Sequence, residues 1–375
     1  RQAGISCPVL VGGAALSNRF TRLRIAPEYD GMVAYAPDAM SGLALANTIQ
    51  DADERAQLMA TFDEETESML VADEASRDPE DVGEDVPPAQ VRHDFDIPNP
   101  ADLRLHVLND HPLDEIFPLI NPQMLYVRHL GYKGRFADDL ESGEHAAIEL
   151  HDSVRRVEDL MLAQENIKAN AVLKFFPANS DGQRILVYGA ENQNIAEEFY
   201  LGRQSQRDGL CLADYLLPQS SGQVDYVGMF VVSVGTGVRA LAEKWIAEGQ
   251  FLNSHILSAL ALESAEAFAE LLHQQMRQMW GFGDPTGTSP RDLFRTQYRG
   301  KRFSFGYPAC PRLEDQEQLF RLLDVSANLN VELTEGFMMD PESSVSALVF
   351  HHPDAKYFNL SERDIDQLEE RFSQG

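Results

Sequence analysis

The chain has 375 residues, of which 60 are acidic and 31 are Lys or Arg, so its formal net charge is −29 at pH 7. A surface this acidic repels phosphate groups, which excludes nucleic acid and anionic membranes as expected partners. The hydrophobic share of 43% is typical of globular domains, and the length allows two or three of them.

The first 50 residues have an α/β pattern. A short apolar run ends in Gly12 and Gly13 and precedes a helical stretch, residues 14–23. A second apolar run, 32–35, precedes a second helical stretch, 39–49. The pattern predicts two strand–turn–helix units. Glycines after a strand also let a bulky ligand approach the backbone, but a tight turn is the favoured interpretation.

Acidic residues dominate residues 51–90, whose second half also contains several prolines. This composition predicts a charged helix as far as residue 70, followed by an extended linker. The segment is the best candidate for a domain boundary. We therefore expect three parts, residues 1–50, 51–90 and 91–375.

Helices and strands mix without regular alternation after residue 91, which predicts an α+β domain. The expected helices are 112–134, 144–168, 238–278 and 362–372. In the second of these, five apolar residues lie on or near one face, namely Ile148, Val154, Val157, Leu160 and Leu162. The expected strands are 172–178, 183–188, 226–234, 329–334 and 345–350, the first two joined by a hairpin-type turn.

The three cysteines, Cys7, Cys211 and Cys310, are odd in number and far apart. They predict a reducing, cytoplasmic environment without disulfides. No apolar run reaches the roughly 18 residues that a membrane span needs, and the first residues do not resemble a signal peptide. The chain begins without Met, so a fragment of a longer protein is expected.

Two motifs favour a structural interpretation over a functional one. Residues 233–237, with Gly235 and Gly237, resemble a cofactor-binding glycine loop but lack an acidic residue at the end of a second strand, so a tight turn is favoured. His351 and His352, near Asp354, suggest a metal site. Neighbouring residues on a strand point to opposite faces, however, so no metal site is expected.

Residues 299–311 combine prolines, glycines and aromatic residues in one short segment. Such a segment predicts a rigid, irregular loop with open backbone groups. Arg302 at its entrance can hold a carboxylate in bidentate fashion, and aromatic rings can cover an adenine or a sulfonium. A purely structural loop remains an equal alternative. Cys310 has no histidine base nearby in the sequence, and we interpret it as a packed thiol.

The segment Tyr298-Arg-Gly-Lys-Arg-Phe-Ser-Phe-Gly-Tyr-Pro-Ala-Cys-Pro311 closely resembles the signature of the activation domain of cobalamin-dependent methionine synthases. Further matches follow in order at 333–339, 344–346 and 352–357, and others precede it at 176–179, 211–215, 225–228 and 265–270. The resemblance covers residues 91–375. It implies a central antiparallel sheet with flanking helices.

Residues 1–50 resemble the end of the Rossmann-like cobalamin-binding domain of the same family, in truncated form. The resemblance implies that Gly12, Gly13 and Ala14 pack against the nucleotide tail of cobalamin. The Asp-x-His-x-x-Gly motif that supplies the cobalt ligand in this family is absent from the sequence. Zinc in this family belongs to a domain further upstream.

The resemblance also implies binding of S-adenosylmethionine and transfer of its methyl group to cob(I)alamin. This step reactivates an enzyme that makes methionine from homocysteine and methyltetrahydrofolate. Arg302 is expected to hold the ligand carboxylate, with Asp114 near its amino group. The other implied contact residues are Glu266, Gly306, Tyr307, Ala309, Tyr357 and Phe358.

Two positions depart from the family pattern: Glu115 replaces a tryptophan, and Thr296 stands where an acid is common. No catalytic residue is expected, because transfer from a sulfonium to a nucleophilic cobalt needs no general base. The implied partners are the remaining domains of the enzyme and a flavodoxin-type electron donor. Arg295, Arg299 and Lys301 are candidates for the basic patch to which that acidic donor would dock.

Two other functions stay open at this point. One is a stand-alone, activation-like module that acts on a separate corrinoid protein. The other is an ordinary glycine-loop methyltransferase, in which Gly235 and Gly237 would contact the cofactor. The activation-domain hypothesis predicts that the cofactor binds at the Arg302 loop, whereas the glycine-loop hypothesis predicts that it binds at Gly235 and Gly237.

Overall fold

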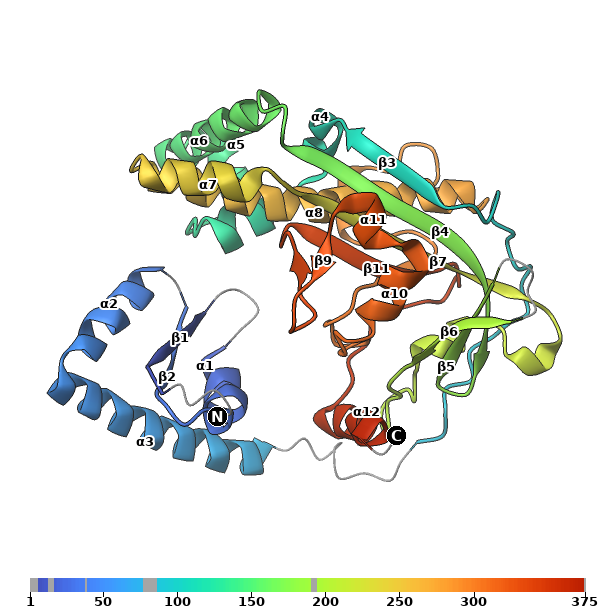
Figure 1. Ribbon diagram of the computed structural model, residues 1–375, viewed down its shortest axis with the longest axis horizontal. Coiled ribbons are helices and arrows are strands. Elements are labelled where there is room, and N and C mark those ends of the chain that lie inside the picture. The colour runs from blue at the N-terminus through green and yellow to red at the C-terminus, as the bar shows by residue number, and fades with distance from the viewer. Residues whose placement is uncertain (1–5, 13–16, 38, 77–85, 190–193, 374–375) are drawn as a thin grey trace. The chain divides into compact units, whose positions relative to one another are not determined.

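The computed structural model describes residues 6–12, 17–37, 39–76, 86–189 and 194–373. The chain divides into two compact units, Arg1–Gly83 and Glu84–Gly375 (Figure 1). Both contain helices and strands, and the described helices include none that is long and apolar enough to cross a bilayer. The finer division at residues 50 and 90 stays a prediction.

The smaller unit contains two parallel strands, β1 (Val9–Gly12) and β2 (Val33–Ala36). Between them lie α1 (Asn18–Phe20), η1 (Thr21–Ile25) and η2 (Ala26–Glu28), and α2 (Ala39–Gln50) follows β2. Both predicted strands are confirmed and each is followed by helical residues, whereas residues 13–16 and 38 lie outside the described part of the chain. A Cβ at Gly12 would lie 2.4 Å from the carbonyl oxygen of Ala36, so the strand pair itself requires a glycine there.

The first part of the acidic segment forms one long helix, α3 (Ala52–Ser76). Arg22 attaches it to the strands: its side chain donates to the carbonyl of Val33, and its guanidinium lies 3.8 Å from the ring centre of Phe62 on α3. Burial lowers the pKa of Arg22, and Glu65 on α3 partly offsets that effect. A buried cation over an aromatic face therefore holds the charged helix in place.

The larger unit is built on a seven-stranded sheet of order β6-β5-β4-β7-β11-β8, with β3 paired to β4. All its pairings are antiparallel. The strands are β3 (His106–His111), β4 (Lys168–Asp181), β5 (Arg184–Tyr188), β6 (Ile195–Tyr200), β7 (Asp225–Thr236), β8 (Lys301–Phe303) and β11 (Ser344–Phe350). The α+β fold with a central antiparallel sheet is confirmed.

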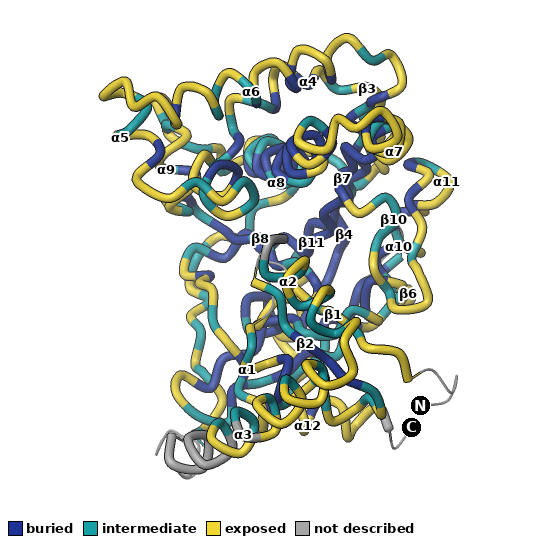
Figure 2. The backbone as a smooth tube through the Cα atoms, turned by 90° about the vertical axis from the view of Figure 1, so that its left-hand side faces the viewer, coloured by how far each residue is buried: buried dark blue, intermediate teal, exposed yellow. Residues whose placement is uncertain are grey.

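Helices cover both faces of this sheet (Figure 1). Alternate residues of the central strands enter different cores, so that Phe175 and Phe230 pack with α6 and α8, whereas Phe176 and Met229 pack with α10 and α11. This explains why β7 is an almost continuous apolar run, and Figure 2 shows β4, β7 and β11 in the buried colour.

The helices of the larger unit are α4 (Leu113–Ile116), α5 (Phe136–Glu141), α6 (His145–Leu162), α7 (Val238–Ala247), α8 (Phe251–Met279), α9 (Pro290–Phe294), α10 (Gln316–Leu323), α11 (Val325–Leu329) and α12 (Glu362–Ser373). Shorter turns are η4 (Phe117–Leu119), η5 (Gln123–His129), η6 (Leu212–Tyr215) and η7 (Gln219–Ser221). A two-stranded sheet joins β9 (Glu332–Leu333) to β10 (Met339–Asp340).

Five element predictions were partly wrong. The helix expected at 112–134 is divided into α4, η4 and η5, and the helix expected at 238–278 is divided into α7 and α8. Helix α6 ends at Leu162 because the chain from Lys168 pairs with β7, and Ile148, Leu160 and Leu162 are exposed while Met161 is buried. The strand expected at 329–334 shrinks to β9, because α11 extends to Leu329 and the next residue, Asn330, is in the left-handed conformation. Within the loop expected at 299–311, β8 forms a strand against β11.

The two adjacent histidines are structural, as predicted. His351 and His352 are fully buried. His351 Nε2 lies 2.6 Å from Asp225 Oδ1, whereas His352 Nε2 donates to the carbonyl of Arg92 at 2.8 Å. Asp225 also accepts from the backbone N–H of Leu217 at 2.8 Å, so this carboxylate joins the start of β7 to the end of β11.

Asp225→Ala should destabilise the larger unit by about 3–5 kcal/mol, because it leaves a buried imidazole and a buried N–H without their acceptor. Chemical denaturation of the purified chain measures this. Asp208→Ala is the matched control, since it removes an exposed pair with Lys356 and should cost less than about 1 kcal/mol. Equal losses in the two variants would contradict the structural role given to Asp225.

Candidate functional site

Arg302 lies at the meeting point of the sheet edge and helix α8. Strand β8 places it opposite Val349 of β11, and its side chain is 16% exposed. Its Nη1 donates to Glu270 Oε2, and its Nη2 lies 3.6 Å from Glu266 Oε2. Burial lowers the pKa of Arg302, but the two carboxylates more than offset this and keep the pKa above its usual value. The guanidinium is therefore a permanent cation.

Glu270 is held from several sides. Its side chain is 10% exposed, and the hydroxyl of Tyr298 donates to its Oε2 at 3.2 Å. Arg277 Nη2 lies 3.8 Å from Glu270 Oε1 and is itself paired with Asp284. The guanidinium of Arg277 also lies 3.8 Å from the ring centre of Tyr298. These contacts form a connected polar network behind Arg302.

Glu266 and two tyrosines form the solvent-facing side of the same cluster. The Glu266 side chain is 45% exposed, and Tyr307 and Tyr357 are 59% and 51% exposed. The Glu266 carboxylate is the main cause of a raised pKa at Tyr307. Burial raises the pKa of Tyr357, an effect that the nearby Arg302 cation opposes. The structure thus brings four predicted site residues together: Glu266, Arg302, Tyr307 and Tyr357.

The loop after β8 is tightly folded. Gly306 N donates to the Cys310 carbonyl and Cys310 N donates to the Tyr307 carbonyl, both at 2.8 Å. Gly306 has φ 82°, and a Cβ there would lie 2.9 Å from the Leu313 side chain. Ala309 is buried in the core under the loop, against which Phe358 also packs. Gly306 therefore shapes the loop, while Ala309 and Phe358 anchor it.

Asp114 stands apart from this cluster. It is exposed on α4, a helix whose neighbour His111 stacks on Phe268 of α8 with ring centres 5.0 Å apart. Among the described residues, no hydrogen bond or ion pair joins Asp114 to Arg302 or its partners. Its role as a ligand contact therefore stays a prediction.

Sequence reasoning missed the network behind Arg302, namely Glu270, Arg277, Asp284 and Tyr298. A signal was available for Glu270, because it follows Glu266 by one helical turn and lies on the same face of α8. Nothing in the sequence marked Arg277 or Asp284, since both become buried only when the end of α8 folds back on the following loop.

The proposed basic patch was wrong for two of its three residues. Lys301 is 9% exposed, and its Nζ donates to the carbonyls of Tyr298 and Gly300. Arg299 is half-buried, and its Nε donates to the carbonyl of His351. Burial lowers the pKa of both groups. These cations support the loop from behind instead of presenting charge to a partner.

The glycines of the other candidate loop have a packing explanation. A Cβ at Gly235 would lie 2.3 Å from the ring of Pro341, and one at Gly237 would lie 2.6 Å from the carbonyl oxygen of Asn166. Gly237 also has φ 78°. The favoured interpretation, a tight turn between β7 and α7, is confirmed, and the glycine-loop methyltransferase loses its support.

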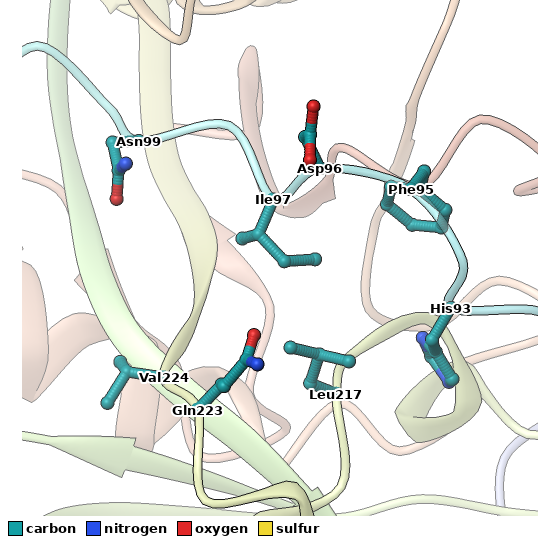
Figure 3. A pocket seen from close by; sticks show the side chains of 8 residues that line it. All are labelled: His93, Phe95, Asp96, Ile97, Asn99, Leu217, Gln223 and Val224. Atoms are coloured by element: carbon teal, nitrogen blue, oxygen red, sulfur yellow. The ribbon is translucent and has the colours of Figure 1, made fainter.

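Two cavities lie away from the Arg302 cluster. One, of about 330 Å³, lies between the segment that carries His93, Phe95, Ile97 and Asn99 and the segment that carries Leu217, Gln223 and Val224 (Figure 3). The other, of about 470 Å³, adjoins the end of α8 and residues 283–288. Neither is lined by a predicted site residue, so the candidate site lies outside these two cavities.

The predicted cobalamin contacts gain no support from the described residues. Gly12 is explained by the carbonyl of Ala36, whereas Gly13 and Ala14 lie outside the described part of the chain. The described residues also contain no group of three His, Cys, Asp or Glu side chains placed to hold a metal ion.

The cysteines differ in accessibility, which makes them a simple check on the packing. Cys7 is exposed, whereas Cys211 and Cys310 are buried. Burial raises the pKa of Cys211 to about 12 and that of Cys310 well above its usual value. The packed-thiol interpretation of Cys310 is confirmed.

With a thiol reagent at pH 8, the folded chain should therefore react rapidly at Cys7 only. Cys211 and Cys310 should react only after denaturation, because a buried neutral thiol is a poor nucleophile. Absorbance of the released chromophore counts the reacting thiols, and Cys7→Ser provides the control. Rapid reaction of Cys7→Ser in its native state would contradict the packing under the loop.

Comparison with known proteins identifies the family to which this chain belongs. The family described as "vitamin B12 dependent methionine synthase, activation domain" matches residues 112–374. The chain belongs to this family, as its sequence motifs predicted.

Two relatives show the extent of the similarity. A methionine synthase of Mycobacterium tuberculosis (strain ATCC 25618 / H37Rv) is 30% identical over 386 aligned residues, which cover 94% of this chain and 32% of the relative. The chain thus spans about a third of that protein's length. A crystal structure of the MetH reactivation domain bound to AdoHcy matches with a TM-score of 0.70 and 28% identity, over 77% of this chain and 95% of that one.

Proposed function

We propose that the larger unit binds S-adenosylmethionine and supplies its methyl group for the reductive reactivation of a B12-dependent methionine synthase. The observation that carries this is the Arg302 cluster: a permanent cation, a half-exposed carboxylate and two exposed aromatic rings in one place. Family membership and the AdoHcy bound by the similar crystal structure support the same ligand class.

Each group in the cluster suits one part of this ligand. Arg302 pairs with the carboxylate of the methionine moiety, because a guanidinium offers two parallel donors to a carboxylate. Tyr307 and Tyr357 present π faces, which suit both an adenine ring and a sulfonium cation. The loop backbone from Gly306 to Ala309 lies beside adenosine, with Phe358 beneath it. Glu266 is close enough to attract the positive sulfonium.

Asp114 completes the proposal as the partner of the ligand's amino group. It is exposed on α4, which packs beside the same helix, α8, that carries Glu266. The acid that commonly precedes the signature segment is replaced by Thr296, so the negative charge around the ligand rests on Glu266, Glu270 and Asp114.

The protein's part in the reaction is to bind, orient and protect the ligand. Cobalamin, when bound, supplies the nucleophilic cobalt that accepts the methyl group. The bond between the methyl carbon and sulfur breaks with release of a neutral thioether, S-adenosylhomocysteine, so no side chain has to move a proton and the reaction needs no general base.

Family membership also suggests which other domains and which partner protein take part in the reaction. The remaining domains of a methionine synthase would hold cobalamin and the other substrates, in the cytoplasm. A flavodoxin-type protein would supply the electron, docking at a surface other than Arg299 and Lys301. The alternative is a module that acts on a separate corrinoid protein, and the length of the M. tuberculosis relative favours the multidomain enzyme.

Arg302→Ala should weaken binding of S-adenosylhomocysteine by about 1.5–3 kcal/mol, because it removes a charge-assisted pair with the ligand carboxylate. Isothermal titration calorimetry of the full chain measures this. Arg239→Ala is the control, since Arg239 is an exposed arginine whose partner is Asp340, on a different part of the surface. Unchanged affinity in Arg302→Ala would move the ligand elsewhere, and no binding by the folded wild type would refute the proposed function for this chain.

A further inference from the structure

We propose that Glu270 is a positioning residue that holds the guanidinium of Arg302 in place, so that its remaining donors face the ligand carboxylate. This inference rests on the proposed function. Two glutamates one helical turn apart contact the same arginine, and the structure gives them different roles. Glu270 is fixed and buried, whereas Glu266 is half-exposed and more distant from the guanidinium.

The first argument is that Glu270 cannot easily leave Arg302. It accepts from both Arg302 and Tyr298 through the same oxygen, Oε2. Its other oxygen, Oε1, is buried and has no hydrogen-bond partner in the described part of the chain. A carboxylate in this position would lose most of its stabilisation if Arg302 moved away, since buried charges need a paired neighbour.

The second argument is that the network behind Glu270 is itself anchored. Arg277 is fully buried, and its Nε donates to Asp284 at 2.7 Å. Its guanidinium lies 3.8 Å from the ring centre of Tyr298, the same residue that donates to Glu270. Because Tyr298 stands only a few residues before β8, the network connects the helix to the strand that carries Arg302.

The third argument concerns entropy. A free arginine side chain has many accessible rotamers, and a ligand that binds it must reduce this conformational freedom. Because Glu270 pairs with Nη1, the Arg302 side chain has already lost this conformational freedom before the ligand binds. The ligand therefore binds a preorganised cation at a lower entropic cost. The distance of 3.6 Å between Arg302 Nη2 and Glu266 Oε2 is too long for a strong hydrogen bond, so that side of the guanidinium stays available to an incoming carboxylate.

The opposite possibility is that Glu270 competes with the ligand for Arg302. The two roles predict opposite signs when the charge of Glu270 is removed. Glu270→Gln keeps the size of the side chain and an acceptor oxygen but loses the charge. If Glu270 positions Arg302, the variant binds S-adenosylhomocysteine more weakly, and if Glu270 competes, it binds more tightly.

The experiment titrates wild type, Glu270→Gln and Glu158→Gln with S-adenosylhomocysteine by calorimetry, after checking that all three melt cooperatively. Glu158 is the matched control, because it is a buried glutamate paired with an arginine, Arg155, on a different helix. We expect a loss of about ten-fold to a hundred-fold in Glu270→Gln alone, similar to the loss of an orienting partner at a metal-binding histidine. Unchanged or tighter binding would overturn the proposal.

A second measurement does not depend on ligand binding. With 15N-arginine labelling, the guanidinium signals of Arg302, assigned from their loss in Arg302→Ala, should show slow rotation in the wild type and fast averaging in Glu270→Gln. Identical signals in both would overturn the positioning role even if the wild type failed to bind ligand, which would refute the proposed function separately.

If Glu270→Gln does not fold, Tyr298→Phe replaces it in both measurements. It removes only the hydroxyl that donates to Glu270. A smaller loss of affinity in the same direction, with partial averaging of the Arg302 signals, is then expected. No change in either measurement would overturn the proposal.

Discussion

The long antiparallel pairing of β4 with β7 determines where the rest of the larger unit can lie. Both strands send apolar side chains to both faces, so each face needs a helical layer to cover it. Helix α8 fills the centre of one layer, and α10 and α11 fill the other. The Arg302 cluster lies where β8, the last strand of the sheet order, meets α8.

In the candidate site, the charge of the nearly buried Arg302 is stabilised while part of its guanidinium stays available to a ligand. Burial alone disfavours the charge of Arg302, and two carboxylates on one helix face restore it. Glu270 is buried and pairs closely with Arg302, whereas Glu266 is half-exposed and more distant. The guanidinium therefore has a defined position and still has a donor group that a ligand can use. The cations Lys301 and Arg299 serve the same region differently, by donating to backbone carbonyls of the loop and strand ends.

The two described cavities lie away from the candidate site, whose Glu266, Tyr307 and Tyr357 side chains are about half-exposed. Gly306 turns the backbone sharply, Ala309 anchors it, and the exposed rings of Tyr307 and Tyr357 remain at the rim.

The sequence by itself determined the features that depend on local pattern. The apolar run of β7, the helical stretch at 238–278, the closing helix α12, the α+β class and the motif order that marks the family can all be read along the chain. Tertiary structure alone decided which face of α6 is buried, which basic residues are hidden, and that Glu270, Tyr298 and Arg277 stand behind Arg302. The reason is physical: Glu270 and Arg302 are 32 positions apart, and only the packing of α8 on the sheet edge removes the water between them and makes their pairing necessary.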